Sequence, residues 1–348
     1  MADLDKFERS QVITQTQQSI RAKGRSLTAD AFYRLSRNRA AIIGAIIIIL
    51  SILSAVFASL IAPKAFDDAS FKDTNGAPVW MTRIFPSMKP IEEGGYVKIR
   101  NSYLLGADSL GRDLLSRVIY GARISLAVGI VTPLISLTVG LLVGLVAGYK
   151  GGRIDNLLMR SVDIMYAFPT YLLIILLMAV FRLGTSAHEP GTPIYALSQL
   201  DAAVGGLLFI FIGIGITSWM SDARLVRGQV LSVRENDYVL AAYALGAPTS
   251  RIILRHILPN IFGPLIIAET LAIPAYIGYE AFLSFIGLGV NPPTPSWGGM
   301  IAEGAPRIQP YPNQAIFPAL ALFVLMFAFN FLGDGLRDAF DPTLRGRE

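Results

Sequence analysis

The stretch ENDYVLAAYALGAPTSRIILRHILPN, residues 235–260, combines helical patterning with turn signals and lies between two strongly apolar blocks. Asp237 stands in its first turn, where a carboxylate suits the positive end of a helix dipole. Gly246, with Pro248 just beyond it, is typical of a helix end. A second short helix is expected over residues 251–258. The stretch therefore predicts two short helices joined at an elbow, and we call residues 235–260 the elbow.

The elbow is too small to fold by itself. About 26 residues cannot form an independent core, because even about 40 usually need a disulfide, a metal or a partner. The outer face of its first helix is nearly bare, since Ala241, Ala242 and Gly246 offer backbone rather than side chains. Such a surface suits close docking by another protein. The alternative is that the elbow folds back on the rest of the chain or lies at the lipid interface.

The composition of the whole chain is typical of a membrane protein. Of its 348 residues, 53% are hydrophobic and 16% are charged, against about 25% charged residues in soluble domains. The chain has no cysteine, and its two histidines, His188 and His256, lie far apart in sequence, so neither a thiolate nor an imidazole metal site is expected. The net charge of +5 does not indicate nucleic-acid binding, because Lys and Arg gather beside the apolar blocks.

Six apolar blocks predict an all-α polytopic membrane protein with six transmembrane helices. The predicted spans cover residues 40–62, 124–148, 162–182, 203–221, 261–287 and 315–333. The first block has a basic flank and begins too far into the chain for a cleaved signal peptide. The loops at 149–161 and 222–260 are rich in Lys and Arg, whereas those at 183–202 and 288–314 contain almost none. The positive-inside rule therefore predicts that both termini are cytosolic.

These spans predict how the chain is organised. We expect a cytosolic N-terminal segment over 1–39, a first transmembrane helix over 40–62, an exported loop over 63–123, a five-helix core over 124–335 that includes the elbow, and a cytosolic tail over 336–348. Small residues at helical spacing in VGLLVGLVAG, residues 139–148, indicate close helix packing.

Charged residues near the spans suggest local roles. Apolar residues recur at helical spacing from Leu110 to Tyr120, which predicts an amphipathic helix on the outer membrane surface. Ion pairing inside the bundle is expected for the charged residues around it, Asp108, Arg112, Asp113, Arg117 and Arg123, with contact to a binding protein as the alternative for Arg112 and Asp113. The group Asp222, Arg224 and Arg227 is interpreted as an anchor at the membrane edge that could also brace the elbow.

Two carboxylates fall in or near the fifth apolar block. An ionisable residue inside a membrane is costly and normally faces a cavity or a partner. Glu269 is therefore a candidate residue of a translocation pathway, with a structural hydrogen bond across helices as the alternative. Glu280 lies nearer the outer end, where a structural or gating role is expected. The proline-rich run that follows, NPPTPSW at 291–297, predicts a stiff exported turn.

The second part of the elbow carries a family resemblance. AAYALGAPTSRIILRHILPN, residues 241–260, resembles the EAA loop of bacterial ABC-importer permease subunits, whose pattern is Glu-Ala-Ala, three residues, Gly, nine residues, then Ile-x-Leu-Pro. Leu240 stands where the family commonly has Glu, and His256 stands where it has Ile. The matching residues are Ala241, Ala242, Gly246, Leu258 and Pro259.

Other strings narrow the resemblance. One example is EAFLSFIGLGVNPPTPSWGGMI, residues 280–301. Together with the strings at 105–129, 148–169, 218–232 and 329–345, it resembles the second, C-type permease of the dipeptide/oligopeptide group. GRSLTADAFYRLSRNRAAI, residues 24–42, is similar to the oligopeptide branch.

The resemblance implies a type I ABC-importer permease architecture in a bacterial inner membrane, with the elbow as a cytosolic coupling helix. The implied partners are a homologous B-type permease, two ATPase subunits, an extracytoplasmic peptide-binding protein and membrane lipid. The chain itself would be non-catalytic and bind no cofactor, because ATP and Mg would bind to the ATPase subunits. The implied cargo is di- or oligopeptides, although relatives carry nickel or other solutes. The implied ATPase-coupling residues are Asp237, Ala241, Ala242, Gly246, Arg251, Arg255 and Pro259.

Two other classes of function, a secondary transporter and an intramembrane hydrolase, make different demands on the sequence. The chain has no G-x-x-x-x-G-K-[ST] motif, so ATP would have to bind to another polypeptide. A proton-coupled secondary transporter is the alternative, with Glu269 and Glu280 as the proton relay. An intramembrane hydrolase is not expected, because neither His188 nor His256 lies in a predicted span where it could serve as a base.

Overall fold

The fold is built from helices. This computed structural model describes residues 27–185 and 192–340, and no strand forms within those two ranges. The longer helices are α2 (Leu27–Leu35), α3 (Arg39–Val56), α6 (Leu114–Lys150), α7 (Gly152–Tyr166), α8 (Thr170–Thr185), α9 (Pro193–Ala203), α10 (Leu207–Arg234), α11 (Asp237–Ala244), α13 (Leu258–Phe285), α14 (Trp297–Gly304) and α15 (Asn313–Phe340). Shorter elements are α4 (Ala58–Ile61), α5 (Val79–Ile84), α12 (Thr249–Arg251) and a π-helical segment, Ile252–Ile257.

Several of these helices can cross a bilayer. Five helices in the described ranges are long and apolar enough, and the bent pair of α7 and α8 adds a sixth span if the two count as one. The all-α class with six spans that the sequence predicts is therefore confirmed. His188 and the two chain ends, residues 1–26 and 341–348, lie outside the described residues.

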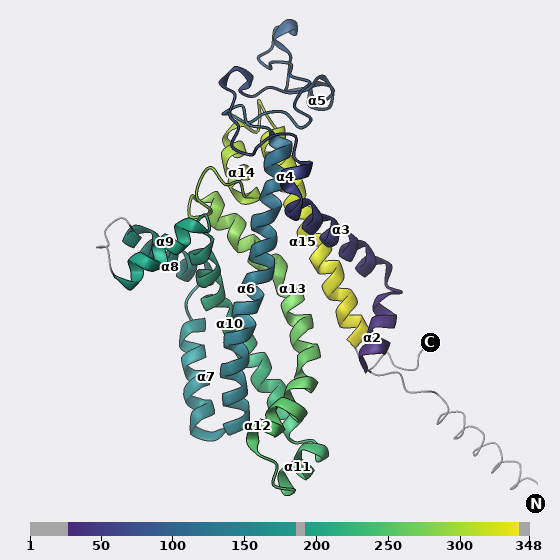
Figure 1. Cartoon of the computed structure of the whole chain (residues 1–348), viewed down its shortest axis with the longest axis vertical. Coiled ribbons are helices and arrows are strands. Elements are labelled where there is room, and N and C mark those ends of the chain that lie inside the picture. Colours follow the sequence, from purple (N-terminus) through teal and green to yellow (C-terminus); the bar gives the residue numbers. More distant parts are fainter. Residues whose placement is uncertain (1–26, 186–191, 341–348) are drawn as a thin grey trace, which may run out of the picture.

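The molecule is elongated, with α5 and α14 at one end and α11 and α12 at the other (Figure 1). We call these the α14 end and the α11 end. α6 runs between them, α8 and α9 project to one side, and α3 and α15 lie on the other side. Ile48 of α3, Leu126 of α6 and Phe329 of α15 share one buried apolar cluster. Ile174 of α8 and Phe209 of α10 belong to a second one.

Glycines hold α6 and α10 close together. Gly140, Gly144 and Gly148 recur every four residues along the buried face of α6. A Cβ added to Gly144 would lie 2.6 Å from the carbonyl oxygen of Ala223 in α10, which is closer than real Cβ atoms come. Small residues at this spacing let two helix backbones approach closely in lipid. The packing signal read from residues 139–148 is confirmed.

The predicted surface helix before the second span is wrong. α6 begins at Leu114 and continues without a break to Lys150, so the helical spacing between Leu110 and Tyr120 belongs to the first turns of the span itself. Asp113 caps this helix by accepting a hydrogen bond of 2.7 Å from the backbone N–H of Ser116. Leu114 and Ser116 are buried inside the protein, so this turn cannot lie on a membrane surface.

The third apolar block forms two helices rather than one straight span. α7 ends at Tyr166, α8 begins at Thr170, and the two axes differ by 85°. Pro169 lies in the break, where its missing N–H and its ring oppose a continuous helix. The fourth span is longer than predicted, because α10 continues through residues 222–234, which were assigned to a loop.

The second half of the elbow does not end where predicted. Pro259 and Asn260 were expected to terminate a short helix, yet the chain stays helical from Thr249 to Phe285. The π-helical segment Ile252–Ile257 lies directly before Pro259. In such a segment the backbone hydrogen bonds join residues five rather than four apart. The helix can therefore continue through Pro259, although proline has no N–H to donate. At the other end of the core, α15 extends to Phe340, past the predicted start of the tail at 336.

Candidate functional site

The first half of the elbow forms as the sequence predicts. α11 ends in a Schellman motif, in which the N–H of Gly246 bonds to the carbonyl of Tyr243 at 3.0 Å and the N–H of Ala247 bonds to the carbonyl of Ala242 at 3.1 Å. Gly246 has a φ of +76°, a conformation that side chains with a Cβ rarely adopt. A Cβ at this position would meet no atom within 4 Å, so the need for glycine comes from the backbone alone.

The elbow presents apolar side chains to its surroundings. Leu245 is 88% exposed, Tyr243 is 69% exposed and Leu240 is 55% exposed. Val239 is the buried anchor of α11, and it packs in one cluster with Ile252. The predicted coupling residues are all exposed or half-buried: Asp237, Ala241, Ala242, Gly246, Arg251, Arg255 and Pro259. An apolar surface of this kind marks a site for contact with another surface.

A groove lies beside α11. It has a volume of about 380 Å³, and its walls come from the ends of α6 and α10, from α11 and from the π-helical segment. Tyr149, Leu240 and Tyr243 contribute apolar surface to it. Arg234 also lines it and donates a hydrogen bond of 2.9 Å to the carbonyl of Gly148, which fixes one wall.

Glu269 is buried between helices rather than on an open face. It is 6% exposed, and the hydroxyl of Tyr276 donates to its Oε2 at 3.3 Å. Its carboxyl group lies near that of Asp222 on α10, and Asp222 accepts a hydrogen bond from Ser136 of α6. The other oxygen of Glu269, Oε1, has no hydrogen-bond partner among the described residues. The bond between Ser136 and Asp222 joins α6 to α10, whereas the bond from Tyr276 to Glu269 stays within α13. The role of Glu269 therefore stays a prediction.

Asp222, which was interpreted from the sequence as part of an anchor at the membrane edge, is buried inside the bundle. It is 6% exposed, and a Cβ on Gly140 of α6 would lie too close to the Cβ of Asp222 for both atoms to fit. The close approach of α6 and α10 is what buries it. The sequence did not predict the burial of Asp222, because the two arginines that follow it suggest an exposed charged group. In the structure both arginines bind to residues of α7 instead.

The two arginines after Asp222 contact α7 rather than the elbow. Arg227 makes two bonds to Asp155, of 2.5 and 2.7 Å, and Arg224 pairs with Asp163 at 2.6 Å. The suggested brace from these residues to the elbow is therefore wrong. They attach α7 to α10 instead.

Glu280 is fully buried near the α14 end. The hydroxyl of Ser284 donates to it at 2.7 Å, and the hydroxyl of Ser296 donates to Ser284 at 3.1 Å. Ser296 also caps α14 at its N-terminus. This hydrogen-bonded chain ties α13 to the helix that follows it, so the contacts of Glu280 are structural.

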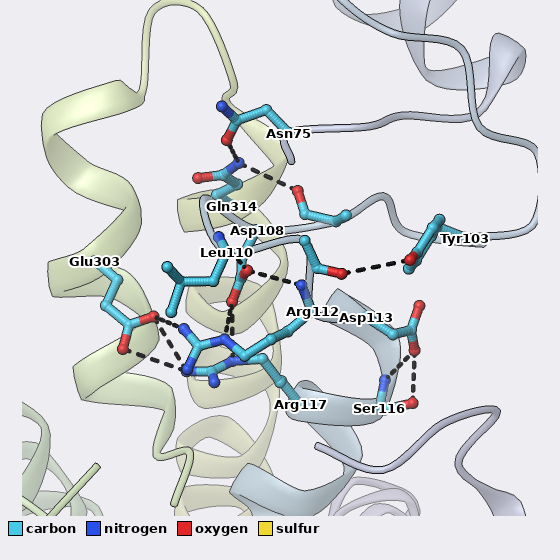
Figure 2. Close-up of polar contacts among 12 residues, drawn as sticks. Asn75, Tyr103, Asp108, Leu110, Arg112, Asp113, Ser116, Arg117, Glu303 and Gln314 are labelled. Carbon is cyan, nitrogen blue, oxygen red and sulfur yellow. Dashed lines mark hydrogen bonds and ion pairs between the residues drawn. The ribbon is translucent and has the colours of Figure 1, made fainter. Parts of the chain in front are cut away.

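The charged residues before the second span form a network inside the protein (Figure 2). Arg112 pairs with Asp108 at 2.6 Å and with Glu303 of α14 at 2.9 Å, and Arg117 reaches Glu303 at 3.1 Å. Arg117 is only 2% exposed. The prediction of internal ion pairing is confirmed for these residues. Glu303 was missed because residues 288–314 were read as a loop, although the pair Ser296–Trp297 resembles a helix start.

Nothing in the described ranges is arranged to hold a metal. No group of three or more His, Asp or Glu side chains gathers in residues 27–185 and 192–340. The site residues are thus an exposed apolar elbow at one end, a charged network at the other, and a buried carboxyl pair between them.

Comparison with known families decides the class of protein. The family of binding-protein-dependent transport system inner membrane components matches residues 140–346, and the N-terminal transmembrane domain of oligopeptide transport permease C matches residues 26–78. The chain belongs to this permease family. Its resemblance to the C-type permeases of the dipeptide/oligopeptide group is thereby confirmed, and members of the family are non-catalytic membrane subunits.

Relatives match nearly the full length of the chain. The oligopeptide transport system permease protein OppC of Bacillus subtilis is 38% identical over 94% of this permease and 93% of its own length. The OppC protein of Escherichia coli K12 is 37% identical over 97% of this permease and 98% of its own length. The dipeptide transport system permease protein DppC of Bacillus subtilis is 38% identical over 94% of this permease and 89% of its own length.

A solved structure shares the fold. A chain of the inward-facing MetNI methionine ABC transporter aligns with a TM-score of 0.50 and 18% identity, covering 65% of this permease and 97% of that chain. The architecture of an ABC-importer permease is therefore confirmed for this chain. The membrane helices and the family together make it a multi-pass inner-membrane permease.

Proposed function

We propose that this permease is the C-type membrane subunit of an ATP-driven importer of di- and oligopeptides. It forms half of the translocation pathway, and a homologous B-type permease forms the other half. Two ATPase subunits bind ATP and Mg on the cytosolic side, and an extracytoplasmic binding protein delivers the peptide. The permease binds no cofactor of its own.

The exposed elbow is the observation that carries the proposal. Leu240, Tyr243 and Leu245 form an apolar surface at the α11 end, where a membrane protein would otherwise meet water. Such a surface is stable when another protein covers it. We assign the α11 end and both termini to the cytosol, and the ATPase subunit to the elbow. The positive-inside asymmetry of the loops supports the same orientation.

The elbow is suited to transmit force. α11 is fixed by the buried Val239 and by its Schellman end, so it is a rigid projection rather than a loose loop. Leu240 replaces the Glu that is common in the family, which makes this docking surface more apolar. Closure of the ATPases would move α11 and, through it, the continuous helix from Thr249 to Phe285.

Peptides are the cargo that the relatives favour. Transport of oligopeptides or dipeptides is in the names of the OppC and DppC proteins that match over most of this chain. The described residues hold no cluster of potential metal ligands, which gives no support for nickel as the cargo.

Reconstitution in liposomes tests the proposal. The complete importer should accumulate trialanine when ATP and the binding protein are both present. The permease alone should accumulate none, with or without a proton gradient. Accumulation by the permease alone under a proton gradient would replace the proposal with secondary transport through Glu269 and Glu280. Absence of ATPase subunits from the complex purified in mild detergent would also contradict it.

A further inference from the structure

Three tyrosines from separate helices gather on one side of the molecule. Tyr171 of α8 packs edge-to-face on Tyr279 of α13, with ring centroids 5.1 Å apart. Tyr166, at the end of α7, lines the same cavity as Tyr279. Tyr166 and Tyr171 are about half exposed, and Tyr279 is partly exposed. We call Tyr166, Tyr171 and Tyr279 the tyrosine wall.

The hydroxyls of the tyrosine wall have no partner within the described part of the chain. Tyr171 contacts Tyr279 and Phe282 ring to ring, and no hydrogen bond of the Tyr171 or Tyr279 hydroxyl is found in the described residues. Tyr166 contributes the face of its ring to a cation, the guanidinium of Arg224, at 4.3 Å. Moving a hydroxyl from water into hydrocarbon without a hydrogen bond costs about 2 kcal/mol or more. The wall therefore faces a polar medium or a polar ligand rather than acyl chains.

An exposed ion pair beside the wall supports the same conclusion. Arg224 pairs with Asp163 at 2.6 Å, and their side chains remain 42% and 62% exposed. Charged groups inside a membrane face a water-filled cavity or a partner. Because Arg224 also stacks on Tyr166, the ion pair and the tyrosine wall share one face.

The position of this face along the bundle follows from its neighbours on α6. The turn of α10 that holds Arg224 lies next to Gly140 and Gly144 of α6, since a Cβ on Gly140 would meet the backbone of Ala223 at 3.0 Å. Gly140 is ten residues from Lys150, the nearest charge on α6, which corresponds to about 15 Å of helix. That is about half the thickness of the hydrocarbon layer.

A cavity of about 180 Å³ opens beside the wall. It lies at the break between α7 and α8, and none of the residues that line it is charged. Tyr166 and Tyr279 form part of its lining, together with Ser218 and Ser221 near the middle of α10. The hydroxyls of Ser218 and Ser221 donate to carbonyls of their own helix, so their oxygens remain available as acceptors. The cavity offers aromatic faces and hydroxyls but no charge.

We propose that the tyrosine wall lines the translocation pathway of this permease and binds the main chain of the passing peptide. Phenol hydroxyls donate to peptide carbonyls and accept from peptide N–H groups, and the rings contact side chains of any type. The wall itself carries no charge, and the opposite charges of Arg224 and Asp163 on the same face neutralise each other, so we expect no selection among peptides by the charge of their side chains. This inference rests on the proposed function, and it replaces Glu269 and Glu280, which are buried, with residues that reach an open face.

Removal of the three hydroxyls tests the contact with the main chain. The variant carries Tyr166→Phe, Tyr171→Phe and Tyr279→Phe, which keeps every ring, and Tyr120→Phe serves as the control because no hydroxyl contact of Tyr120 is found in the described residues. In the complete reconstituted importer, each lost hydrogen bond should lower uptake about two- to tenfold and the triple variant at least about tenfold. The ratio of variant to wild-type uptake should be equal for Ala-Ala-Ala, Ala-Lys-Ala and Ala-Glu-Ala.

Labelling of a single cysteine tests whether the face is wet. The chain contains no cysteine, so Ser221→Cys, on the exposed edge of the cavity, introduces a unique thiol. A membrane-impermeant maleimide should label it, and trialanine supplied with the binding protein should slow the labelling. Leu50→Cys, on the exposed apolar face of α3, should stay unlabelled.

The outcomes separate the two proposals. A wild-type importer that moves no peptide contradicts the proposed function, while labelling at Ser221→Cys still tests the wall. Wild-type uptake by the triple phenylalanine variant overturns the inference. So does labelling of Ser221→Cys no faster than that of Leu50→Cys, which would assign the face to lipid or to the sister permease. A loss of uptake confined to one of the charged peptides would overturn the assignment to the main chain.

Discussion

Gly246 is the residue on which the shape of the elbow depends. Its φ of +76° costs a residue with a Cβ roughly 1–2 kcal/mol, even though the surrounding space is open. Gly246→Val should therefore unwind the end of α11 and lower peptide-stimulated ATP hydrolysis by the assembled importer, while membrane insertion stays normal. The ATP hydrolysis of Gly246→Asn should fall between that of Gly246→Val and that of the wild type, because Asn tolerates this conformation better than Val does. Gly228→Val, at an open helical position of α10, is the control. Normal stimulation in Gly246→Val would contradict the role of the elbow.

Glu269 and Asp222 are two neighbouring carboxyl groups inside the bundle. No Lys or Arg of the described residues pairs with either of them, so each depends on hydrogen bonds from its neighbours. Glu269→Gln keeps a group that can bond to both Asp222 and Tyr276, and it should fold with near-normal stability while its uptake of trialanine changes. Glu269→Leu leaves the hydroxyl of Tyr276 without its acceptor, while Asp222 keeps its bond from Ser136, and it should lower the free energy of unfolding by about 1–3 kcal/mol.

Thermal unfolding in detergent, together with uptake in liposomes, measures both Glu269 variants. If Gln destabilises the permease as much as Leu, hydrogen bonding is not what Glu269 supplies. If Glu269→Gln transports at the wild-type rate, its role is structural only.

Asp73 gives the loop at the α14 end a dependence on pH. A hydrogen bond of 2.6 Å from Arg100, with further bonds from Ser70 and Tyr103, holds the pKa of Asp73 below its usual value of 3.8. A lowered carboxyl pKa stabilises the folded loop above the unfolded pKa, and this stabilisation is lost as pH falls below it. Amide protection around Tyr103, corrected for intrinsic exchange, should fall between about pH 6 and about pH 3.

The same measurement on Asp73→Asn should show weaker protection at the higher pH and little further loss on acidification. Asp67→Asn, at an exposed carboxylate of the same loop, should behave like the wild type. A pH profile that is equal for Asp73→Asn and the wild type would show that another group controls the loop.

At the scale of elements, the seam between α6 and α10 depends on small residues. Gly144→Ala would bring a Cβ to 2.6 Å from both the carbonyl oxygen of Ala223 and the Cβ of Val226, so the two helices must separate. Overpacking of this kind typically costs about 1–3 kcal/mol. Gly278→Ala is the matched control, since its Cβ would lie 3.9 Å from Met326, an ordinary contact. Thermal midpoints that are equal for the two variants would contradict the close seam.

The sequence predicted this seam and the course of most spans, because apolar length and small-residue spacing are local properties. It did not predict the 85° bend at Pro169, since apolar residues flank the proline on both sides and hydropathy carries no direction. The pairing of Asp222 with Glu269 was hidden for a different reason. Their partners are set by the packing of α10 against α6 and α13, which brings together residues far apart in the sequence.

Some parts of the candidate site could be predicted from the sequence and others could not. The glycine end of α11 follows from local turn chemistry, so Gly246 was found without a structure. The tyrosine wall was not, because Tyr166, Tyr171 and Tyr279 come from three helices and show no spacing pattern. Arg117 was expected in an ion pair, but its partner Glu303 lies in a short helix that proline and glycine residues obscured.

At the scale of the whole molecule, one helix connects the two ends. From Thr249 the chain stays helical to Phe285, a stretch of 37 residues that measures about 55 Å. It begins beside α11 and runs toward α14 (Figure 1). Tyr279 of the tyrosine wall belongs to it, and near its end Glu280 is linked to the start of α14 through Ser284 and Ser296. A displacement of the elbow therefore reaches the pathway and the α14 end through a single rigid element, apart from the π-helical segment Ile252–Ile257.

The π-helical segment sets the angle at which the elbow joins this helix. Pro259 maintains it, because proline offers no N–H for the ordinary bond to the carbonyl of Arg255. Pro259→Ala restores that donor, so the segment should relax toward an α-helix and turn α11 relative to α13. The importer should then still hydrolyse ATP but move fewer trialanine molecules per ATP. Pro264→Ala, a proline of the same helix beyond the π-helical segment, should keep the wild-type ratio. Equal ratios of uptake to hydrolysis in the two variants would mean that motion passes from the ATPase to the pathway by another route.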